Sequence, residues 1–369
     1  MSALDTDLGQ VPRDRSPTRQ KLQAGESVAL VYSDRVSQRD RLEDHRVTGD
    51  RTRRGYPRTM SLEIDKVTKR FGANVALDGI EFSVPRGEIF GFLGANGAGK
   101  TTTMRICLGI LEADSGEVRW DGTSSTDLPR RTWGYLPEER GLYARMTVVD
   151  QLVYFASLYG ESPERARREA LHWLARFRIP DYADRRAEEL SKGNQQKVQF
   201  IAAILHEPDV LLMDEPFTGL DPVNLQLLRE AFLELRDRGR TLIFSTHQME
   251  MAEAMCESVA IIDRGRVVAG GTVRSLKRAS GRRMVRLGLD GSPDLAWLAG
   301  LEGVTITRPG VDHTEVELTN GTEPAALLAA AAARGSTITR FELSEPTLEA
   351  LFIEHVGRPA DDAERTLAP

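Results

Sequence analysis

The stretch GANGAGKT at residues 94–101 constrains the fold of this chain more than any other segment does. It matches the pattern Gly-x-x-x-x-Gly-Lys-Thr, with Gly94, Gly99, Lys100 and Thr101 at the defined positions. An apolar run, EIFGFL, precedes it, and the run TTTMRICLGIL follows it. A strand, a glycine loop and a helix in this order form a phosphate-binding loop. The segment therefore predicts a sheet flanked by helices, with a nucleotide site at the loop.

The residue types of this loop suit phosphate chemistry. Glycines let backbone N–H groups curl around phosphate oxygens, and the helix N-terminus adds partial positive charge. Lys100 is predicted to bridge the β- and γ-phosphate oxygens, and the Thr101 hydroxyl to ligate Mg²⁺. The other loop and first-turn positions predicted to contact the nucleotide are Asn96, Gly97, Ala98 and Thr102. A glycine turn without a function is the alternative, which the strand–loop–helix context disfavours.

Two carboxylates end a second apolar run, VLLMDEP, at residues 210–216. On a buried strand beside the phosphate-binding loop, Asp214 can hold the Mg²⁺ shell, and Glu215 can orient and deprotonate an attacking water. Alone, this pattern often marks a strand that ends in solvent. Together with the loop, it predicts Asp214 as a metal ligand and Glu215 as a catalytic base.

Two further candidates come from other apolar runs. TLIFSTH, residues 241–247, predicts a third strand that ends with His247. That side chain can touch the γ-phosphate, although a lone histidine is as often structural. Phe71, upstream of the loop, offers a ring that can stack on adenine, with a core phenylalanine as the alternative.

Composition excludes several classes of protein. The chain has 369 residues, a net charge of −6 and two cysteines, Cys107 and Cys256. The acidic balance gives no support for bulk nucleic-acid binding, and two distant cysteines make neither a disulfide framework nor a metal cluster. No apolar run approaches the roughly 18 residues needed to span a bilayer. We therefore expect a reducing compartment, and any action at a membrane to come from outside the lipid.

The pattern divides the chain into four segments. Residues 1–59 are rich in Arg, Asp, Ser and Thr and are predicted to be disordered. They are either a flexible tail or the product of a misassigned start, with translation beginning at Met60. Residues 60–278 alternate strands and helices, which predicts an α/β domain with a helical subdomain at about 147–200.

The third segment, residues 280–358, follows the order β-α-β-β-α-β and predicts a small α+β domain of the ferredoxin-like type. It closes with EPTLEALFIEHVG, in which four apolar residues form one helical stripe that we expect to face a core. These residues are Leu348, Leu351, Phe352 and Val356. The polar fourth segment, residues 359–369, is predicted to be a loose tail.

In their order, the motifs resemble those of an ABC-transporter ATPase subunit over roughly residues 61–275. The resemblance rests on Phe71, the loop at 94–101, YLPEERGLY at 135–143, LSKGNQQK at 190–197, VLLMDEP, GLDP at 219–222 and His247. Residues 280–358 resemble the small accessory domain of drug- and sodium-exporting ATPases. The implied fold is an α/β P-loop NTPase of the ABC ATPase type, with a helical subdomain and a ferredoxin-like C-terminal domain.

This resemblance implies a function. It implies an enzyme that hydrolyses ATP with Mg²⁺ in a head-to-tail dimer, either a homodimer or a heterodimer with a paralogue. The dimer would drive transport, with export favoured, through a separately encoded membrane permease. The expected location is peripheral, at the cytoplasmic face of the cell membrane, and no nucleic acid is expected. On this basis the catalytic candidates are Lys100, Glu215 and His247.

The stretch LSKGNQQK is the second phosphate-binding element that the sequence predicts. Ser191 and Gly193 stand before a helix and are expected to close on a nucleotide held by a second copy. Asp221, in the loop at 219–222, is predicted to join that nucleotide site. Lys192 departs from the glycine usual in the family and removes neither Ser191 nor Gly193. Glu138 departs more strongly, because a charged metal ligand replaces the usual neutral glutamine.

Two other classes of protein share parts of this motif set. A soluble ABC ATPase acting on ribosomes or DNA is the alternative. Family members of the ribosome type look like two ATPase domains joined in one chain, whereas this chain has one set of the motifs. The interval between Lys100 and Ser191 has no sustained heptad, unlike the coiled coil of chromosome-type members. A small-molecule kinase has no use for the stretches at 190–197 and 219–222.

Overall fold

The computed structural model describes residues 61–357 and Ala360, apart from residues 140, 291–294, 311, 320 and 336. The predicted disorder of residues 1–59 and the proposed start at Met60 lie outside the described residues. So does the predicted loose tail at 359–369, except for Ala360.

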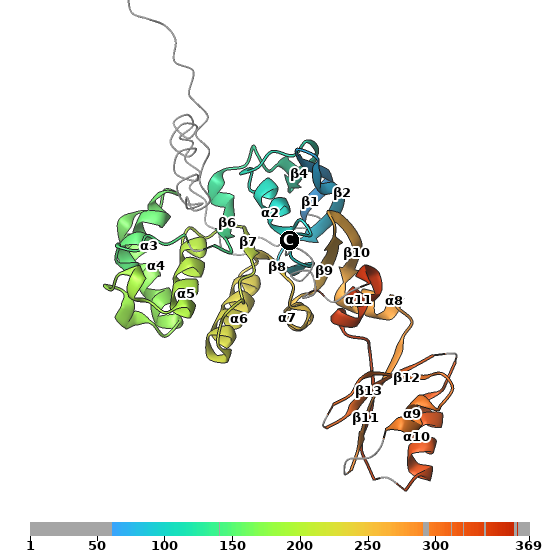
Figure 1. The fold of residues 1–369 in the computed structure, drawn as a ribbon. Coiled ribbons are helices and arrows are strands. Elements are labelled where there is room, and N and C mark those ends of the chain that lie inside the picture. Colours follow the sequence, from blue (N-terminus) through green and yellow to red (C-terminus); the bar gives the residue numbers. More distant parts are fainter. Residues whose placement is uncertain are drawn as a thin grey trace, which may run out of the picture. The chain divides into compact units, whose positions relative to one another are not determined.

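A six-stranded sheet forms the central layer, with the strand order β10-β9-β3-β8-β7-β6 (Figure 1). Its strands are β3 (Ile89–Leu93), β6 (Trp133–Leu136), β7 (Val210–Asp214), β8 (Thr241–Thr246), β9 (Ser258–Asp263) and β10 (Arg266–Thr272). All neighbouring pairs are parallel except β10 with β9. Every residue of β3, β7 and β8 is buried, as expected of parallel strands covered on both faces. The strands predicted from the three apolar runs are confirmed.

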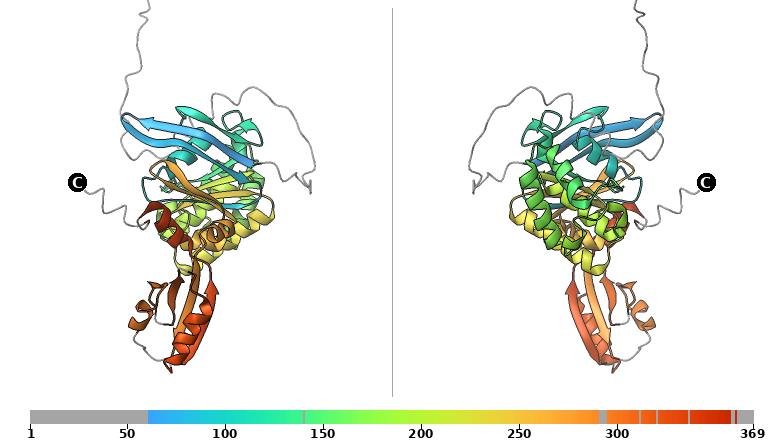
Figure 2. Two further views of the ribbon diagram at one scale, coloured as in Figure 1. Left: turned by 90° about the vertical axis from the view of Figure 1, so that its right-hand side faces the viewer. Right: turned by 90° about the vertical axis from the view of Figure 1, so that its left-hand side faces the viewer.

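A second, antiparallel sheet covers one face of the central layer, as the side views show (Figure 2). It consists of β2 (Asn74–Pro85), β1 (Ser61–Phe71), β4 (Ser115–Trp120) and β5 (Thr123–Ser124), in that order. Helix α2 (Lys100–Cys107) contributes Met104 and Cys107 to the core that joins the two sheets. The helix after the phosphate-binding loop is therefore fixed by packing against both sheets.

Helices cover the other face of the central sheet. They are α3 (Val148–Ser157), α4 (Pro163–Arg176), α5 (Lys192–Ile204), α6 (Pro222–Asp237) and α7 (Met249–Met255), with the short 3₁₀ turns η2 (Pro180–Tyr182) and η3 (Ala187–Glu189). A further 3₁₀ turn, η1 (Arg130–Thr132), directly precedes β6. Side chains alternate along the strands, so Leu211 and Met213 face these helices while Val210 and Leu212 face the antiparallel sheet. Helices α3 to α5 fall in the region where the sequence predicts a helical subdomain.

The C-terminal part begins with α8 (Val273–Ala279) and continues with a small antiparallel sheet of order β12-β13-β11-β14. The elements are β11 (Arg283–Leu289), α9 (Ala296–Ala299), β12 (Val304–Arg308), β13 (Thr314–Leu318), α10 (Pro324–Ala333), β14 (Ile338–Ser344) and α11 (Leu348–Val356). Strand β13 lies between β11 and β12 and runs antiparallel to both. This split β-α-β arrangement is the ferredoxin-like topology predicted from the sequence.

The apolar stripe of α11 is buried, but not in the core of the small sheet. Leu348, Leu351 and Phe352 are at most 2% exposed and belong to the core on the helical face of the central sheet. That core also contains Met249 and Ala252 of α7. The sequence predicts α11 as part of the small domain at 280–358, whereas its apolar stripe packs in the core of the large α/β part. An amphipathic stripe does not specify which core it meets.

Candidate nucleotide site

The phosphate-binding loop connects β3 to α2 and has room only for glycine at two of its positions. A Cβ atom on Gly94 would lie 2.6 Å from the carbonyl oxygen of Ile262, and one on Gly99 would lie 2.6 Å from a methyl group of Leu77. Gly99 has a φ of 113° and Gly97 a φ of 78°, both in the left-handed region that favours glycine. The loop therefore lies tightly against β9 and β2, with its backbone turned as phosphate binding requires.

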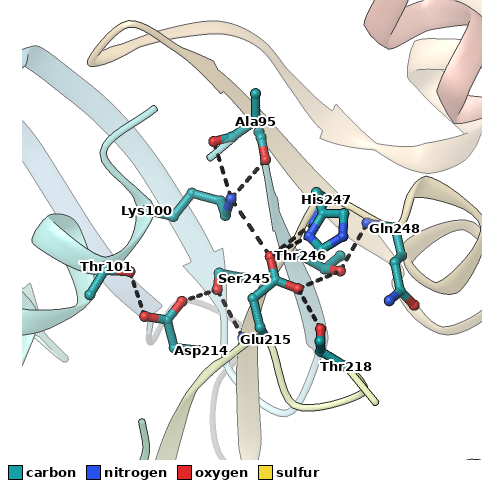
Figure 3. A network of polar contacts seen from close by, with 11 residues as sticks. Ala95, Lys100, Thr101, Asp214, Glu215, Thr218, Ser245, Thr246, His247 and Gln248 are labelled. Atoms are coloured by element: carbon teal, nitrogen blue, oxygen red, sulfur yellow. Dashed lines mark hydrogen bonds and ion pairs between the residues drawn. The ribbon is translucent and has the colours of Figure 1, made fainter. Parts of the chain in front are cut away.

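Lys100 starts α2 and points its ammonium group back over the loop (Figure 3). Its Nζ donates to the carbonyl oxygens of Gly94 at 2.7 Å and Ala95 at 3.2 Å. It also lies 3.7 Å from Oε1 of Glu215. Burial lowers the pKa of Lys100, and the nearby carboxylates of Glu215 and Asp214 oppose that shift. A buried cation thus occupies the space above the loop, where it can meet phosphate oxygens.

Asp214, at the end of β7, accepts hydrogen bonds on both carboxylate oxygens. The Thr101 hydroxyl donates to Oδ2 at 2.5 Å, and the Ser245 hydroxyl donates to Oδ1. Ser245 is the register partner of Asp214 on the neighbouring strand β8. Asp214 is 1% exposed. The possible metal ligands gathered here are oxygen atoms of a carboxylate and of hydroxyl groups, which fit a hard cation such as Mg²⁺.

Glu215 follows Asp214 and is held from several sides. Its Oε1 accepts from the backbone N–H of His247 at 3.1 Å and lies 2.9 Å from Nδ1 of the same residue. Its Oε2 accepts from the hydroxyl groups of Thr218 and Thr246, each at 3.3 Å. Glu215 has a φ of 48°, a left-handed conformation that is uncommon outside glycine. Strained backbone of this kind concentrates at functional sites, and here it holds the carboxylate beside Lys100.

Glu138 lies just beyond β6, in the loop where the sequence predicts a charged metal ligand. Its pKa is raised by desolvation and by the negative charges of Asp214 and Glu215, and Lys100 counteracts this. The carboxylate therefore shares the electrostatic environment of the cluster at the carboxyl end of the sheet.

Phe71 ends β1 and is 50% exposed, so it is not a core residue. The Nζ of Lys69 lies 5.7 Å from the centre of its ring. An exposed aromatic face of this kind is available for stacking.

The residues predicted to act on a second nucleotide lie at two helix starts. Ser191 caps α5 and accepts from the N–H of Asn194 at 3.3 Å. Asp221 caps α6 and accepts from the N–H of Asn224 at 2.9 Å. A Cβ atom on Gly193 would lie 3.0 Å from Nδ2 of Asn224, so the two helix starts are neighbours. The structure brings the two helix starts together, and the side-chain oxygens of Ser191 and Asp221 serve as their caps.

Sequence reasoning missed the hydroxyl groups that hold the two carboxylates. Ser245 and Thr246 stand in the run TLIFSTH, directly before His247. The available signal was their position at the end of a buried strand, because the carboxyl ends of parallel strands meet at one edge of a sheet. No such signal pointed to Thr218, because its contact with Glu215 depends on the turn after β7.

The site and the fold define a P-loop nucleoside triphosphatase, and comparisons with known proteins narrow this class. Residues 77–218 match the family model described as ABC transporter. Residues 271–356 match the model described as ATP-binding protein DrrA1-3-like, C-terminal domain.

Three relatives match this chain over most of its length. The chain is 45% identical over 296 residues to the uncharacterized ABC transporter ATP-binding protein YhaQ of Bacillus subtilis, which covers 80% of this chain and 98% of the relative. It is 32% identical over 313 residues to the daunorubicin/doxorubicin resistance ATP-binding protein DrrA of Streptomyces peucetius, covering 82% and 94% of the two chains. It is 31% identical over 312 residues to the linearmycin resistance ATP-binding protein LnrL of Bacillus subtilis, covering 82% and 100%.

A solved ATP-binding subunit of an ABC transporter superposes with a TM-score of 0.56 at 35% identity, covering 60% of this chain and 93% of that one. The chain belongs to the ABC transporter ATP-binding proteins, a family that binds and hydrolyses ATP. Within the described residues, no helix is both long and apolar enough to cross a membrane.

Proposed function

We propose that this chain is the ATP-hydrolysing subunit of an exporter and drives a separately encoded membrane permease from the cytoplasmic face of the membrane. The observation that carries the proposal is the cluster at one edge of the parallel sheet in which the buried side chains of Lys100 and Glu215 meet the partly exposed side chain of His247. Two relatives named for drug resistance, one for daunorubicin and doxorubicin and one for linearmycin, support export as the direction.

The chain's own residues are suited to hold ATP. Phe71 would stack on the adenine, and the loop at 94–99 would surround the phosphates with backbone N–H groups. Lys100 would exchange the carbonyl oxygens of Gly94 and Ala95 for phosphate oxygens, which carry more charge. Thr102, in the first turn of α2, would contact the same phosphates near the helix N-terminus.

Thr101, Asp214 and Glu138 would hold Mg²⁺, which when bound would neutralise the charge that develops on the phosphate oxygens. The Thr101 hydroxyl donates to Asp214 at 2.5 Å, so the two oxygen donors are already adjacent. Ser245 orients Asp214 through its other oxygen. Glu138 would add a negative ligand where a neutral glutamine is usual in the family.

Glu215 would act as the general base. Its carboxylate would accept a proton from a water molecule as the water oxygen attacks the γ-phosphorus. The bond between the γ-phosphorus and the bridging oxygen would break, and ADP would leave with that oxygen and its electron pair. His247 holds Oε1 of Glu215 through its backbone N–H and its ring Nδ1. The opposite side of the imidazole ring would face the γ-phosphate. Thr218 and Thr246 would keep the other carboxylate oxygen in place.

Ser191, Gly193 and Asp221 would act on the nucleotide of a second subunit. One set of phosphates is served by the chain's own loop, so the second helix start has no evident nucleotide in the same chain. A two-fold dimer places it against the ATP held by the other copy. Closure on ATP and release after hydrolysis would then supply the movement passed to the permease.

A purification from native membranes tests the partner. The tagged chain, extracted with detergent, is expected to bring down a protein with several membrane spans in a fixed ratio, and vesicles containing both should show ATP-dependent transport. The Lys100→Ala variant is the control for transport. Recovery with ribosomes or DNA in place of a membrane protein would contradict the proposal and favour the soluble alternative.

A mixing experiment tests the dimer. Lys100→Ala and Ser191→Arg each inactivate both sites of their own homodimers. A mixed dimer with sites shared between copies keeps one intact site, so random pairing should restore roughly a quarter of the wild-type turnover. If the two sites are strictly coupled, turnover can stay low, and ATP-induced dimerisation of the same mixture on a Glu215→Gln background becomes the readout. No recovery in either assay would show that Ser191 acts within its own chain.

A further inference from the structure

Glu253 connects α7, in the large α/β part, with two helices of the C-terminal region. It lies on α7, the short helix that begins two residues after His247. Its Oε2 accepts a hydrogen bond from the backbone N–H of Leu348 at 2.8 Å, and its Oε1 lies 2.5 Å from Nζ of Lys277. Leu348 starts α11 and Lys277 belongs to α8, and both fall within the matched C-terminal region at 271–356. One carboxylate therefore ties α7 to two C-terminal helices.

The contact with α11 is a helix cap supplied from another element. Thr347 caps the helix from its own side by accepting from the N–H of Ala350 at 3.2 Å. Glu253 adds a negative charge at the first N–H, where the partial positive charge of the helix end favours it. Beneath this contact, Leu348 and Phe352 pack in one core with Met249 of α7. Polar and apolar contacts thus fix the same two helices against each other.

The opposite end of α7 reaches the candidate base. The backbone N–H of Gln248, which caps α7, donates to the Thr246 hydroxyl at 3.0 Å. That hydroxyl donates in turn to Oε2 of Glu215 at 3.3 Å. His247, between these two residues, contacts Oε1 of Glu215. A displacement of α7 would therefore move groups that hold both oxygens of Glu215.

The far end of α11 is joined to the small sheet. Arg282 donates to Oε1 of Glu317, on β13, at 2.6 Å. The same guanidinium group lies 3.7 Å from Oε2 of Glu354 on α11. Helix α11 consequently has contacts with the small sheet at one end and with Glu253 at the other.

We propose that Glu253 is a positioning residue for ATP hydrolysis: it holds α7 against α8 and α11, and so makes the C-terminal part of the chain a determinant of turnover. This inference rests on the roles of Glu215 and His247 given under the proposed function. Small displacements of catalytic groups are costly, and a misplacement of about 1 Å can reduce a rate by about 10²-fold. Because several other contacts remain when Glu253 is lost, the expected fall in kcat is smaller.

Three variants separate the two contacts of this carboxylate. Glu253→Ala removes both. Glu253→Gln keeps an acceptor for the N–H of Leu348 but loses the charge that faces Lys277, and Lys277→Met loses that charge from the other side. Glu250→Ala, an exposed position on the same helix, is the matched control.

The steady-state ATPase of the full chain is measured with Mg²⁺ well below the lowest melting temperature of the set. Glu253→Ala is expected to lower kcat about five- to tenfold with KM changed less than about twofold, because positioning affects the reacting state more than binding. Glu250→Ala should match wild type. A role in stability alone would lower the melting temperature and leave kcat unchanged.

The outcomes are distinct. Absence of ATP hydrolysis in the wild-type chain would defeat the proposed function itself. Normal hydrolysis in wild type, with kcat of Glu253→Ala within about twofold of it or with the entire loss in KM, would overturn the positioning role alone. An equal loss in Glu250→Ala would overturn it as well. If Glu253→Ala does not fold, a fall in kcat of about threefold or more in Glu253→Gln or Lys277→Met at constant KM supports the inference, and smaller changes in both overturn it.

Discussion

The large α/β part and the small C-terminal sheet place their charged side chains in opposite ways. In the large part, Lys100, Asp214 and Glu215 are at most 7% exposed and meet at one edge of the parallel sheet. In the small sheet, Arg286 pairs with Glu315 at 3.2 Å and with Glu342 at 3.7 Å across neighbouring strands, with side chains 16–46% exposed. Among the described residues of β11 to β14, Thr314 is the one polar residue that is buried, and it carries no charge.

The strand directions account for this difference. Parallel strands all end at the same edge of a sheet, so polar residues that follow several strands converge there. Antiparallel strands alternate in direction, and their charges find partners directly across the ladder. The large part therefore collects buried groups that can act together on a ligand, whereas the charges of the small sheet neutralise one another. We therefore expect the reaction to depend on the charged side chains of the large part and not on the ion pairs of the small sheet.

The largest expected effect follows from removing the buried cation of the first region. Lys100→Ala should weaken ATP binding and lower turnover by at least about 10²–10³-fold, because it removes the buried ammonium group that donates to the Gly94 and Ala95 carbonyl oxygens and would meet the phosphates. Arg340→Ala, in the small sheet, should leave both quantities at wild-type values. Calorimetric titration with ATP and a phosphate-release assay measure them. Turnover of Lys100→Ala within about tenfold of wild type would show that the buried charges of the large part are not needed for the reaction.

A buried histidine of the large part should make the stability of the protein depend on pH. His206 is 2% exposed, its Nε2 lies 2.9 Å from the carbonyl oxygen of Trp133, and burial lowers its pKa from 6.5 to about 4. Between these values the unfolded chain binds a proton that the folded chain does not. The free energy of unfolding should therefore fall as the pH drops through this window, by up to about 3 kcal/mol from this residue.

The variant that checks this is His206→Gln, whose side-chain amide can still donate to Trp133 but does not titrate. Its unfolding free energy, from urea denaturation between about pH 7 and about pH 4, should be less sensitive to pH than that of wild type. Equal pH dependence in the two proteins would show that His206 is not the group responsible.

The smallest effect is expected in the small sheet. Arg286→Ala breaks two partly exposed ion pairs and should cost about 1 kcal/mol or less in stability, with the ATPase rate unchanged. Thermal melting and steady-state kinetics measure the two quantities. A large loss of turnover would mean that these surface charges take part in the reaction, and the contrast between the two regions would fail.

Local sequence patterns predicted much of the fold and of the site. Short apolar runs that end in Gly94, Asp214 and His247 predicted the three central strands, because residues buried on both faces need no alternation. The loop at 94–101 could be placed from the spacing of its glycines and Lys100 alone. Each of these predictions depends on neighbours in the sequence.

What could not be predicted depends on partners that are distant in the sequence. Ser245 meets Asp214 only through the register of β8 against β7, which no local pattern specifies. The left-handed backbone of Glu215 occurs where its N–H bonds to Ser245 on β8 and its side chain to His247, partners about 30 residues away that no local pattern specifies. The spacing of apolar residues predicts a buried stripe on α11, but its packing partner, α7, depends on how the chain returns to the large part.

The most direct test of the account is a single-turnover measurement on Glu215→Gln. The substitution removes the carboxylate charge and keeps the shape of the side chain, so ATP should still bind at the loop and at Lys100. Cleavage of the bound ATP, followed by rapid quench, should be at least about 10²-fold slower than in wild type. The ATP-bound protein should then accumulate as a dimer. Cleavage at a near-normal rate with ATP bound would contradict the account, because another residue would have to activate the water.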